Sequence, residues 1–502
     1  MQVVVGTEVT DSIAAGVLHP DAFDLGTLPK QSGAQKYTVV TPDGHVDAGL
    51  RQTAIHSRLM TARRTYRPIL MSSPKIRLES GTPSAPWFRY YAGYSESFVS
   101  DVLESFNLPR HAVVLDPWNG TGTTTSVARR MGYTAHGYDI NPVLVLVARA
   151  RLLGPEVADS LTSIAEDVVS DLSHASSRGA TWPCDPLSWW LDEQSSETLR
   201  SLEQNIHGLL VGTTEAYPLF ECSSLDHVSS LAAFFYVALF RSLHHHLSPF
   251  KGSNPTWIKV ARSDDERVAV TREAAARAFL HEVEALEAYV RASSDAALSA
   301  LRPHATIDVG ESANLTMSDG EADAAVTSPP YCTRLDYAIA TLPELAVLGA
   351  PSRCSVKALR RRMLGTPTMQ DHDDMASPSR SWGPTCSAFL DSVKGHPTKA
   401  SADYYHRYYL QYFAGLDRSL AELLRVLRSG GQGAIVVQDS YYKDIHNDLP
   451  HIVSEMLTAG GGEIQSRQDF GVKWNYRDIN SRSRRYRPKN RATEAVIVFQ
   501  KV

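Results

Sequence analysis

Short apolar runs that end in polar or glycine-rich turns recur in two separated parts of the chain. The runs 112–115 and 134–138 each end at an acidic residue, Asp116 and Asp139, and 321–327 has a similar pattern. Runs of this length and composition are typical of buried parallel strands. Ligands of open α/β sheets bind at the carboxyl ends of the strands, so we expect the residues after these runs to share one rim.

The pattern changes to a helical period between these two parts. Apolar positions recur at helical spacing in three stretches: 155–172, 197–210 and 264–301. We therefore predict a helical insertion over 151–304, placed between the second and third strands of the sheet. Helix and strand alternate again from about residue 404, and two late strands are predicted at 463–470 and 492–501.

The turn after the first strand has the sequence DPWNGTGTT, residues 116–124. Gly120 and Gly122 allow the backbone to turn tightly and to approach a ligand closely. Asp139 lies 23 residues beyond Asp116 and is placed to accept hydrogen bonds from both ribose hydroxyls of a nucleoside cofactor. The turn lacks the Gly-Lys-Ser/Thr ending of a phosphate loop. The cofactor residues predicted from these two strands are Asp116, Pro117, Gly120, Gly122, Asp139, Ile140 and Asn141.

A second motif, Thr-Ser-Pro-Pro-Tyr at 327–331, follows the later strand. The Ser328 side chain and the Pro329 carbonyl can each accept one N–H of a nucleobase amine, which favours a geometry that frees the nitrogen lone pair. Two adjacent prolines, Pro329 and Pro330, restrict the backbone that carries these acceptors. Tyr331 offers a ring face for an extruded base. The alternative is an ordinary Pro-Pro turn with a packing tyrosine.

Together, the two motifs resemble those of the DNA amino-methyltransferases, the family that makes N4-methylcytosine or N6-methyladenine from S-adenosylmethionine (AdoMet). The Ser-Pro-Pro-Tyr form resembles the cytosine-N4 branch, whereas Asp-Pro-Pro-Tyr is more typical of adenine-N6 enzymes. Trp118 stands where the family usually has Phe. The resemblance covers roughly 85–150 and 305–502.

Three further segments share this resemblance. Residues 88–99 resemble an upstream helix whose aromatic residue, here Phe98, packs near the methionine part of AdoMet. Glu311 and Ser312 resemble the segment that contacts the adenine, although Glu311 replaces the usual Asp. Residues 423–440 resemble the helix, glycine turn and fifth strand of the family.

The resemblance implies an α/β fold with a seven-stranded, mostly parallel, Rossmann-like sheet and a large helical insertion. The segments we predict are an N-terminal arm of unclear role (1–84), an AdoMet-binding half (85–150), the helical insertion (151–304), the catalytic strand and motif (305–331), a loop-rich target-recognition segment (332–402) and the remainder of the methyltransferase domain (403–502). A chain of 502 residues has room for such additions.

The implied function is site-specific cytosine-N4 methylation of duplex DNA by base flipping and direct in-line attack, in restriction-modification or phage defence. Adenine-N6 methylation is the alternative. A catalytically idle recognition subunit is expected to have lost Asp139 or the Ser-Pro-Pro-Tyr residues. Cytosine-C5 chemistry needs a cysteine after proline, and Pro183-Cys184 lies in the predicted insertion. RNA and protein-glutamine methyltransferases usually have Asn or Asp first in this motif.

Local charge supports a nucleic-acid partner although the net charge is −5. Residues 473–491 combine aromatic residues with a basic run that includes Lys473, Arg482, Arg484, Arg485 and Arg487. This mixture suits phosphate contact and stacking, and a solvated loop is the alternative. We expect sequence readout mainly in 332–402, through residues that include Arg334, Arg360 and Arg380, with 151–304 as the second candidate.

Composition favours a cytoplasmic enzyme without a metal centre. The five cysteines form no C-x-x-C pair, which argues against a disulfide framework or a zinc site. The longest apolar run, 231–240, is too short to span a bilayer. No basic-then-apolar N-terminus indicates a signal peptide. A cognate restriction or defence partner is compatible with the resemblance, and the oligomeric state stays open.

Overall fold

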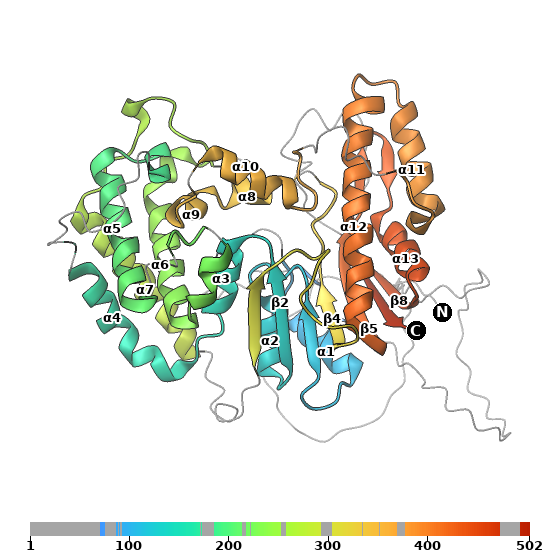
Figure 1. The fold of residues 1–502 in the computed structure, drawn as a ribbon, viewed down its shortest axis with the longest axis horizontal. Helices are drawn as coiled ribbons and strands as arrows, with labels where there is room; N and C mark the ends of the chain where they lie inside the picture. The colour runs from blue at the N-terminus through green and yellow to red at the C-terminus, as the bar shows by residue number, and fades with distance from the viewer. Residues whose placement is uncertain are drawn as a thin grey trace, which may run out of the picture.

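The centre of the molecule is a single mixed sheet flanked by helices, with a helical lobe on one side (Figure 1). The computed structural model describes residues 71–75, 87–88, 90, 93–170, 172, 185–212, 217–220, 222–252, 258–292, 304–333, 335–350, 352–368, 377–471 and 492–502. The predicted α/β fold with a seven-stranded, mostly parallel sheet is confirmed.

The sheet has the order β3-β2-β1-β4-β5-β9-β8. Its strands are β1 (Val113–Asp116), β2 (Thr134–Asp139), β3 (Ala305–Val309), β4 (Ala322–Thr327), β5 (Leu427–Gln438), β8 (Gly462–Gly471) and β9 (Thr493–Lys501). The strands β1 to β5 are parallel, and β9 runs antiparallel to both β5 and β8. The carboxyl ends of β1, β2, β4 and β5 therefore share one rim with the start of β9.

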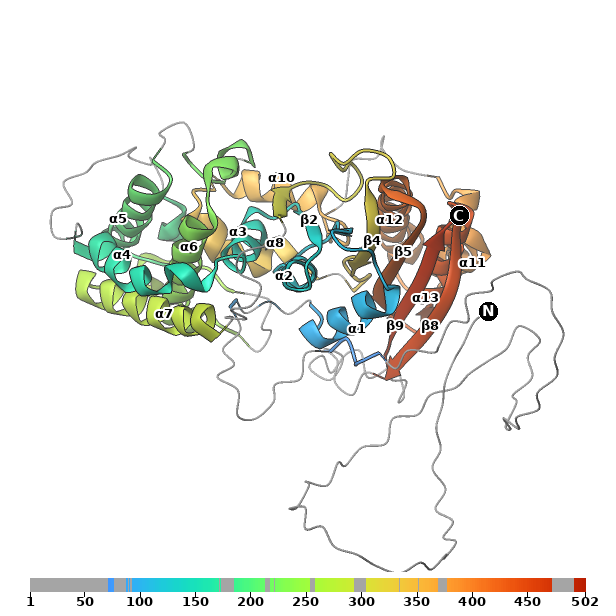
Figure 2. The same cartoon turned by 90° about the horizontal axis from the view of Figure 1, so that it is seen from below.

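Alternate residues of the central strands face two helical layers, as the pleat of a sheet requires. Val326 and Val436 pack under α1 (Glu96–Phe106) and α2 (Thr123–Arg130). Their neighbours on the opposite face pack under three later helices: α11 (Gly383–Gly395), α12 (His406–Val426) and α13 (Leu449–Ala459). Figure 2 shows α1 and these helices on opposite sides of the sheet.

The predicted insertion is helical and forms the lobe. Its long helices are α4 (Ala158–Ser170), α5 (Glu193–Leu210), α6 (Ser230–His246) and α7 (Arg272–Ala292). The residues from Ala232 to Phe240 are all buried, so α6 is the core of the lobe, and α3 (Pro142–Ala150) packs it against the sheet. Within the described residues, no helix is both long and apolar enough to cross a membrane.

The expectation of a loop-rich segment over 332–402 is wrong for much of its length. It contains α8 (Tyr337–Ala340), α9 (Leu342–Val347), α10 (Arg353–Arg362) and α11. Pro343 and Pro384 stand in the first turns of α9 and α11, where the missing N–H has no intrahelical partner to lose. Proline here marks helix starts rather than loops.

Two boundaries also differ from expectation. The helix expected over 88–99 begins at Glu96, because Ser95 caps it by accepting from the Phe98 N–H. The glycines expected to form a turn before the fifth strand lie inside β5, which starts directly after α12. The register between β4 and β5 shifts at this point, so Gly430 and Gly431 belong to a bulge in the strand.

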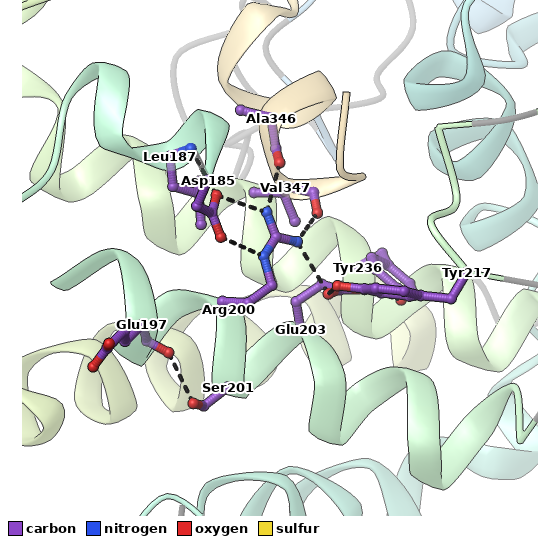
Figure 3. Close-up of polar contacts among 10 residues, drawn as sticks. All are labelled: Asp185, Leu187, Glu197, Arg200, Ser201, Glu203, Tyr217, Tyr236, Ala346 and Val347. Carbon is purple, nitrogen blue, oxygen red and sulfur yellow. Dashed lines mark hydrogen bonds and ion pairs between the residues drawn. The ribbon is translucent and has the colours of Figure 1, made fainter. Parts of the chain in front are cut away.

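A buried arginine joins the lobe to the segment that follows the Ser-Pro-Pro-Tyr motif (Figure 3). Arg200 of α5 donates from Nε and Nη2 to the two carboxylate oxygens of Asp185, at 2.9 and 3.1 Å. Its Nη2 and Nη1 also donate to the carbonyls of Ala346 (2.9 Å) and Val347 (2.6 Å). Arg200 therefore holds the end of α9 against the lobe.

A second carboxylate balances this charge. Glu203, one turn after Arg200, accepts from its Nη1 at 3.1 Å. Tyr217 and Tyr236 each donate a hydroxyl to Glu203 at 2.9 Å (Figure 3). Every member of this cluster is hydrogen-bonded, which is the condition under which buried charges are tolerated.

Two histidines of α6 make further contacts with carboxylates. His244 pairs with Glu344 of α9, and His245 pairs with Glu282 of α7, each at 2.5 Å. Glu344 is fully buried, so α9 is held to the lobe at a second point. Across the described ranges, no group of three or more His, Cys, Asp and Glu residues is arranged to hold a metal ion.

Removing the buried arginine is predicted to destabilise the lobe. Arg200→Ala leaves Asp185 and Glu203 without their cation, and we expect a loss of about 3–5 kcal/mol in the free energy of unfolding. Denaturant unfolding monitored by tryptophan fluorescence measures it. The matched control is Arg291→Ala, which removes the exposed ion pairs with Asp159 and Glu287 and should leave the midpoint almost unchanged. Equal shifts in the two variants would contradict the role given to Arg200.

Candidate active site

The loop after β1 is shaped by two glycines in the left-handed region. Gly120 has φ 52° and Gly122 has φ 79°. The Gly122 N–H donates to the Asn119 carbonyl at 2.8 Å, and the Asn119 N–H donates to Tyr138 of β2 at 2.9 Å. A Cβ on Gly122 would lie 2.7 Å from the Cβ of Ala148. Glycine is therefore required there by both its backbone angle and the contact with α3.

Asp139, at the end of β2, bridges two loops. Its carboxylate accepts from the N–H of Gly120 at 3.0 Å and from the N–H of Asn141 at 2.8 Å. Burial raises the pKa of Asp139 to about 7; these two N–H groups lower it, and the charge of Asp116 adds a smaller increase. The residue as a whole keeps some solvent exposure, and each carboxylate oxygen has acceptor capacity beyond the one bond described.

Asp116, at the end of β1, is almost fully buried and uses both carboxylate oxygens internally. One oxygen accepts from the Thr327 hydroxyl at 2.5 Å and from the Trp118 N–H at 3.1 Å. The other accepts from the Tyr94 hydroxyl at 2.9 Å. Burial raises the pKa of Asp116 against the opposing effect of these donors. Asp116 thus ties the glycine loop to the residue immediately before Ser328, while its predicted contact with a cofactor stays a prediction.

The aromatic residue beside the glycine loop is Tyr90 rather than Phe98. Phe98 has no exposed surface and packs in the core under the sheet, edge-on to Tyr94 at 5.6 Å between ring centroids. Cε1 of Tyr90 would lie 3.6 Å from a Cβ on Gly120. Burial, and next the charge of Asp139, raise the pKa of Tyr90 well above its usual range. The aromatic-rich stretch before the α1 cap was the available sequence signal for this residue.

Two other predicted cofactor residues next to Asp139 have structural partners. Asn141 caps α3 by accepting from the Val143 N–H at 3.1 Å, and it donates to the Thr341 hydroxyl at 2.8 Å. Ile140 is partly buried against the core of the lobe. Pro117, on the neighbouring loop, is buried. These residues shape the rim, and their contact with a ligand stays a prediction.

The segment after β3 lies next to the end of β2. The Gly310 N–H donates to the Asp139 carbonyl at 3.1 Å. Glu311 forms an ion pair with Arg362 at 2.7 Å, and its side chain is 41% exposed. The Ser312 hydroxyl bonds a hydroxyl of α12 at 2.9 Å. The structure therefore brings Glu311 and Ser312 to the same rim as Asp139, as expected from their position in the chain.

The Ser-Pro-Pro-Tyr motif is held by neighbours on both sides. The Ser328 hydroxyl donates to the Val436 carbonyl of β5 at 2.9 Å. Since that bond uses its single proton, the oxygen keeps acceptor capacity. The Pro330 carbonyl accepts from the Tyr412 hydroxyl of α12 at 2.8 Å. The prolines and these bonds together fix the backbone around the Pro329 carbonyl.

Tyr331 contacts a carboxylic side chain that the sequence analysis did not identify. Its hydroxyl donates to Oε1 of Glu494, on β9, at 3.0 Å. Burial raises the pKa of Tyr331 well above its usual range, and the nearby charge of Glu494 raises it further. No local motif surrounds Glu494, so only the antiparallel placement of β9 reveals that it belongs to this rim.

The predicted DNA contacts are only partly covered by the structure. Arg334 and the whole run 473–491 lie outside the described residues. Arg360 forms an ion pair with Asp336 and is one-quarter exposed. Arg380 is exposed and begins the short 3-10 helix Arg380–Trp382, which directly precedes α11. Of the two described arginines, Arg380 is the exposed one, and both assignments stay predictions.

Comparison with known proteins gives short or weak matches. Type II methyltransferase M.BsoBI from Geobacillus stearothermophilus is 39% identical over 57 residues, which span 11% of this chain and 11% of that protein. A SAM-dependent methyltransferase from Methanosarcina mazei is 10% identical and covers 80% of this chain and 97% of its own, with a TM-score of 0.27. A putative sarcosine dimethylglycine methyltransferase from Galdieria sulphuraria is 8% identical and covers 81% and 84%, also with a TM-score of 0.27. No family model matches the chain.

These matches are too short or too weak to assign a function, so the function has to be inferred from the geometry of the site. The chain matches about a tenth of the length of M.BsoBI, and TM-scores of 0.27 are too low to support an inference. The geometry shows one rim that carries a glycine loop, the partly exposed residue Asp139 and the Ser-Pro-Pro-Tyr motif.

Substitution of Gly122 by alanine tests how tightly the loop is built. Gly122→Ala combines an unfavourable backbone angle with a backbone-proximal clash, so we expect a loss of roughly 2–4 kcal/mol in unfolding free energy. Gly132→Ala is the control, because Gly132 also has a positive φ, 91°, but nothing lies within 4 Å of its Cβ position. Thermal unfolding of both variants compares them. A Gly122→Ala protein no less stable than Gly132→Ala would refute the packing argument.

Proposed function

We propose that the chain is an AdoMet-dependent methyltransferase that methylates the exocyclic amine of a base in duplex DNA. The observation that carries this proposal is the buried hydrogen bond between Asp116 and Thr327, 2.5 Å long. It places the glycine loop, with its neighbour Asp139, beside Ser328. In this proposal the glycine loop after β1 and the amine-positioning motif after β4 lie on adjacent strands, with Asp139 at the end of β2 on the other side of β1; proximity of this kind is what a transfer between two bound molecules requires.

The rim fits the nucleoside and amino-acid parts of AdoMet. The carboxylate of Asp139 is the proposed acceptor for the two ribose hydroxyls, and the bonds that it accepts from the Gly120 and Asn141 N–H groups fix its orientation. The tight turn at Gly120 and Gly122 leaves room for close approach of the ligand, with Tyr90 alongside. Glu311 and Ser312 are the residues proposed to contact the adenine. When bound, AdoMet would supply a methyl group on a sulfonium centre: the amine nitrogen would bond to the methyl carbon in line as the carbon–sulfur bond breaks and the neutral thioether leaves, and the methylated amine would lose one proton to water.

The protein's part in the transfer is to prepare the amine. The nitrogen of a base amine is a weak nucleophile because its lone pair is delocalised into the ring. Acceptance of its two N–H bonds by the Ser328 oxygen and the Pro329 carbonyl favours a geometry in which the lone pair is available. Neighbouring residues hold both acceptors in place, so these groups need little rearrangement when the reaction takes place. Tyr331 offers its ring for stacking of the extruded base.

DNA is proposed as the substrate from three observations. The short match to a protein named as a type II methyltransferase points to DNA. The serine-first motif favours cytosine N4 over adenine N6, which remains the alternative product. The basic and aromatic run at 473–491 suits phosphate contact. Sequence readout is proposed mainly for 332–402, where the exposed Arg380 is better placed than the ion-paired Arg360.

The alternative from a different class is an idle DNA-recognition subunit. Such a subunit has no need for an ordered transfer site, yet Asp139, Ser328 and Tyr331 are each present and hydrogen-bonded at the rim. A role in restriction-modification or phage defence, with a cognate partner, follows from the proposed chemistry and is part of the proposal.

Binding of AdoMet is predicted to depend on Asp139 and on pH. Loss of the carboxylate in Asp139→Ala should weaken binding by about 1.5–3 kcal/mol for each hydrogen bond lost. With a pKa of about 7 in the free protein, Asp139 is protonated below that pH, so affinity should increase as pH rises through 7. Isothermal titration from pH 6 to 8 measures both effects. Ser328→Ala, which alters only the amine site, should bind AdoMet like the wild type. Equal affinity in Asp139→Ala would remove Asp139 from the cofactor site.

The product is predicted to be N4-methylcytosine. Nucleoside mass spectrometry of DNA from cells that express the chain, in a host without this modification, should detect it. Ser328→Ala should reduce its amount at least tenfold, since one of two amine acceptors is lost. Detection of N6-methyladenine alone would establish the alternative product. AdoMet binding without any DNA methylation would favour the idle subunit.

A further inference from the structure

Glu494 is a buried carboxyl group beside the Ser-Pro-Pro-Tyr motif. The residue is 6% exposed. Its Oε1 accepts from the Tyr331 hydroxyl at 3.0 Å, whereas Oε2 is buried and has no hydrogen-bond partner among the residues that the structure describes. Leaving a buried carboxyl oxygen unpaired is costly. Such a group beside a candidate active site indicates that a ligand supplies the missing partner.

The position of Glu494 in the sheet places it over the target site rather than the cofactor loop. It stands at the start of the antiparallel strand β9, opposite Gln438 of β5 and Phe470 of β8. Val436, which accepts from the Ser328 hydroxyl, lies two residues earlier on the same β5 strand. Glu494 therefore sits above Ser328 toward the open side of the rim.

The main effect of the surroundings of Glu494 is on the pKa of its carboxyl group. Burial raises its pKa, and the hydrogen bond from Tyr331 and the charge of Lys75 oppose this increase. Burial lowers the pKa of Lys75 itself. The nearby carboxylate of Asp439 is engaged elsewhere, by the Thr493 N–H at 2.8 Å and by His446 at 3.0 Å.

The edge of the target base defines the group that Oε2 can meet. Cytosine and adenine carry, next to the amine, a ring nitrogen that is a hydrogen-bond acceptor. Guanine and thymine carry an N–H at the corresponding position. In the proposed function, Ser328 and Pro329 already take the two amine N–H groups, so the ring nitrogen remains to be satisfied. A carboxylic acid in its neutral form has the O–H that this nitrogen needs.

We propose that Glu494 completes the target-base site: Oε1 fixes the Tyr331 ring, and the protonated Oε2 donates a hydrogen bond to the ring nitrogen beside the reacting amine. The inference rests on the proposed function and adds a determinant of base class. The proton stays on the carboxyl group throughout. An O–H facing the ring N–H that guanine and thymine carry at the corresponding position would leave two donors opposed, so the site accepts cytosine or adenine and rejects guanine and thymine in this orientation.

The test uses the full chain, saturating tritiated AdoMet and long unmodified bacteriophage duplex DNA, with transfer rates measured over the whole pH range, above the ordinary pKa of a carboxyl group, in which the protein stays folded. Wild-type activity should fall as pH rises through the raised pKa of Glu494, because the donor is lost on ionisation. Glu494→Gln carries a permanent N–H donor and should remain within about threefold of wild type at low pH, without the alkaline decline. Glu494→Ala should lose about tenfold or more at low pH, where the wild type keeps its donor, and should show no alkaline decline of its own.

Two controls separate this role from a structural one. AdoMet affinity should be the same in wild type, Glu494→Gln and Glu494→Ala, since the cofactor loop lies on other strands. Tyr331→Phe removes the hydrogen bond to Oε1 but keeps the carboxyl group, so the alkaline decline should persist in this variant.

The outcomes distinguish this inference from the proposed function. A wild type that binds AdoMet but transfers no methyl group to DNA contradicts the proposed function and this inference together. An active wild type with a Glu494→Gln variant as impaired as Glu494→Ala contradicts only the donor role of Glu494. The donor role of Glu494 alone is also contradicted if the wild type is active and Glu494→Gln shows the same fall in transfer rate at high pH as the wild type.

Discussion

The hydrogen bond from the Thr327 hydroxyl to Asp116 joins two motifs that lie about two hundred residues apart in the chain. A carboxylate at this depth is stable only if donors replace the water that it loses. Thr327, Tyr94 and the Trp118 N–H supply them from three different elements. The register of β1 against β4, the start of α1 and the glycine turn are consequently set by one buried group. The candidate cofactor edge and the Ser-Pro-Pro-Tyr motif take their relative positions from it.

A second set of buried charges connects the helical lobe to the same site. Arg200 binds the carbonyls at the end of α9, and His244 binds Glu344 within it. The α9 helix begins eleven residues after the motif ends at Tyr331, and Thr341 at its start accepts from Asn141, close to Asp139. The lobe is therefore not a separate attachment. It supports one end of the rim through contacts that tolerate little displacement, because buried ion pairs lose most of their stabilisation when their geometry is disturbed.

The sequence was sufficient for features that repeat locally. Apolar runs that end at Asp116, Asp139 and Thr327 located the three strands of the site, and the helical period located the insertion. Features set by distant packing were not accessible in this way. Proline and serine content suggested loops where Pro343 opens a helix, because composition does not distinguish a turn from a helix start. Glu494 has no motif around it, and its place beside Tyr331 depends on the antiparallel pairing of β9.

The insertion between β2 and β3 has a consequence for how the chain folds during synthesis. Among the described strands, the edge strand β3 pairs with β2 alone, yet the whole lobe is translated between Asp139 and Ala305. At ribosomal rates this gap lasts on the order of ten seconds or more. Closure of a long loop adds little entropy cost, so equilibrium stability tolerates the interruption.

The nascent β2 edge nevertheless stays unpaired on that side until the lobe has been made, and an unpaired strand edge favours aggregation. Helices of the lobe form fast, local contacts, and α3 packs directly against α6. Early folding of the lobe would therefore stabilise the chain just after β2 while that edge awaits its partner.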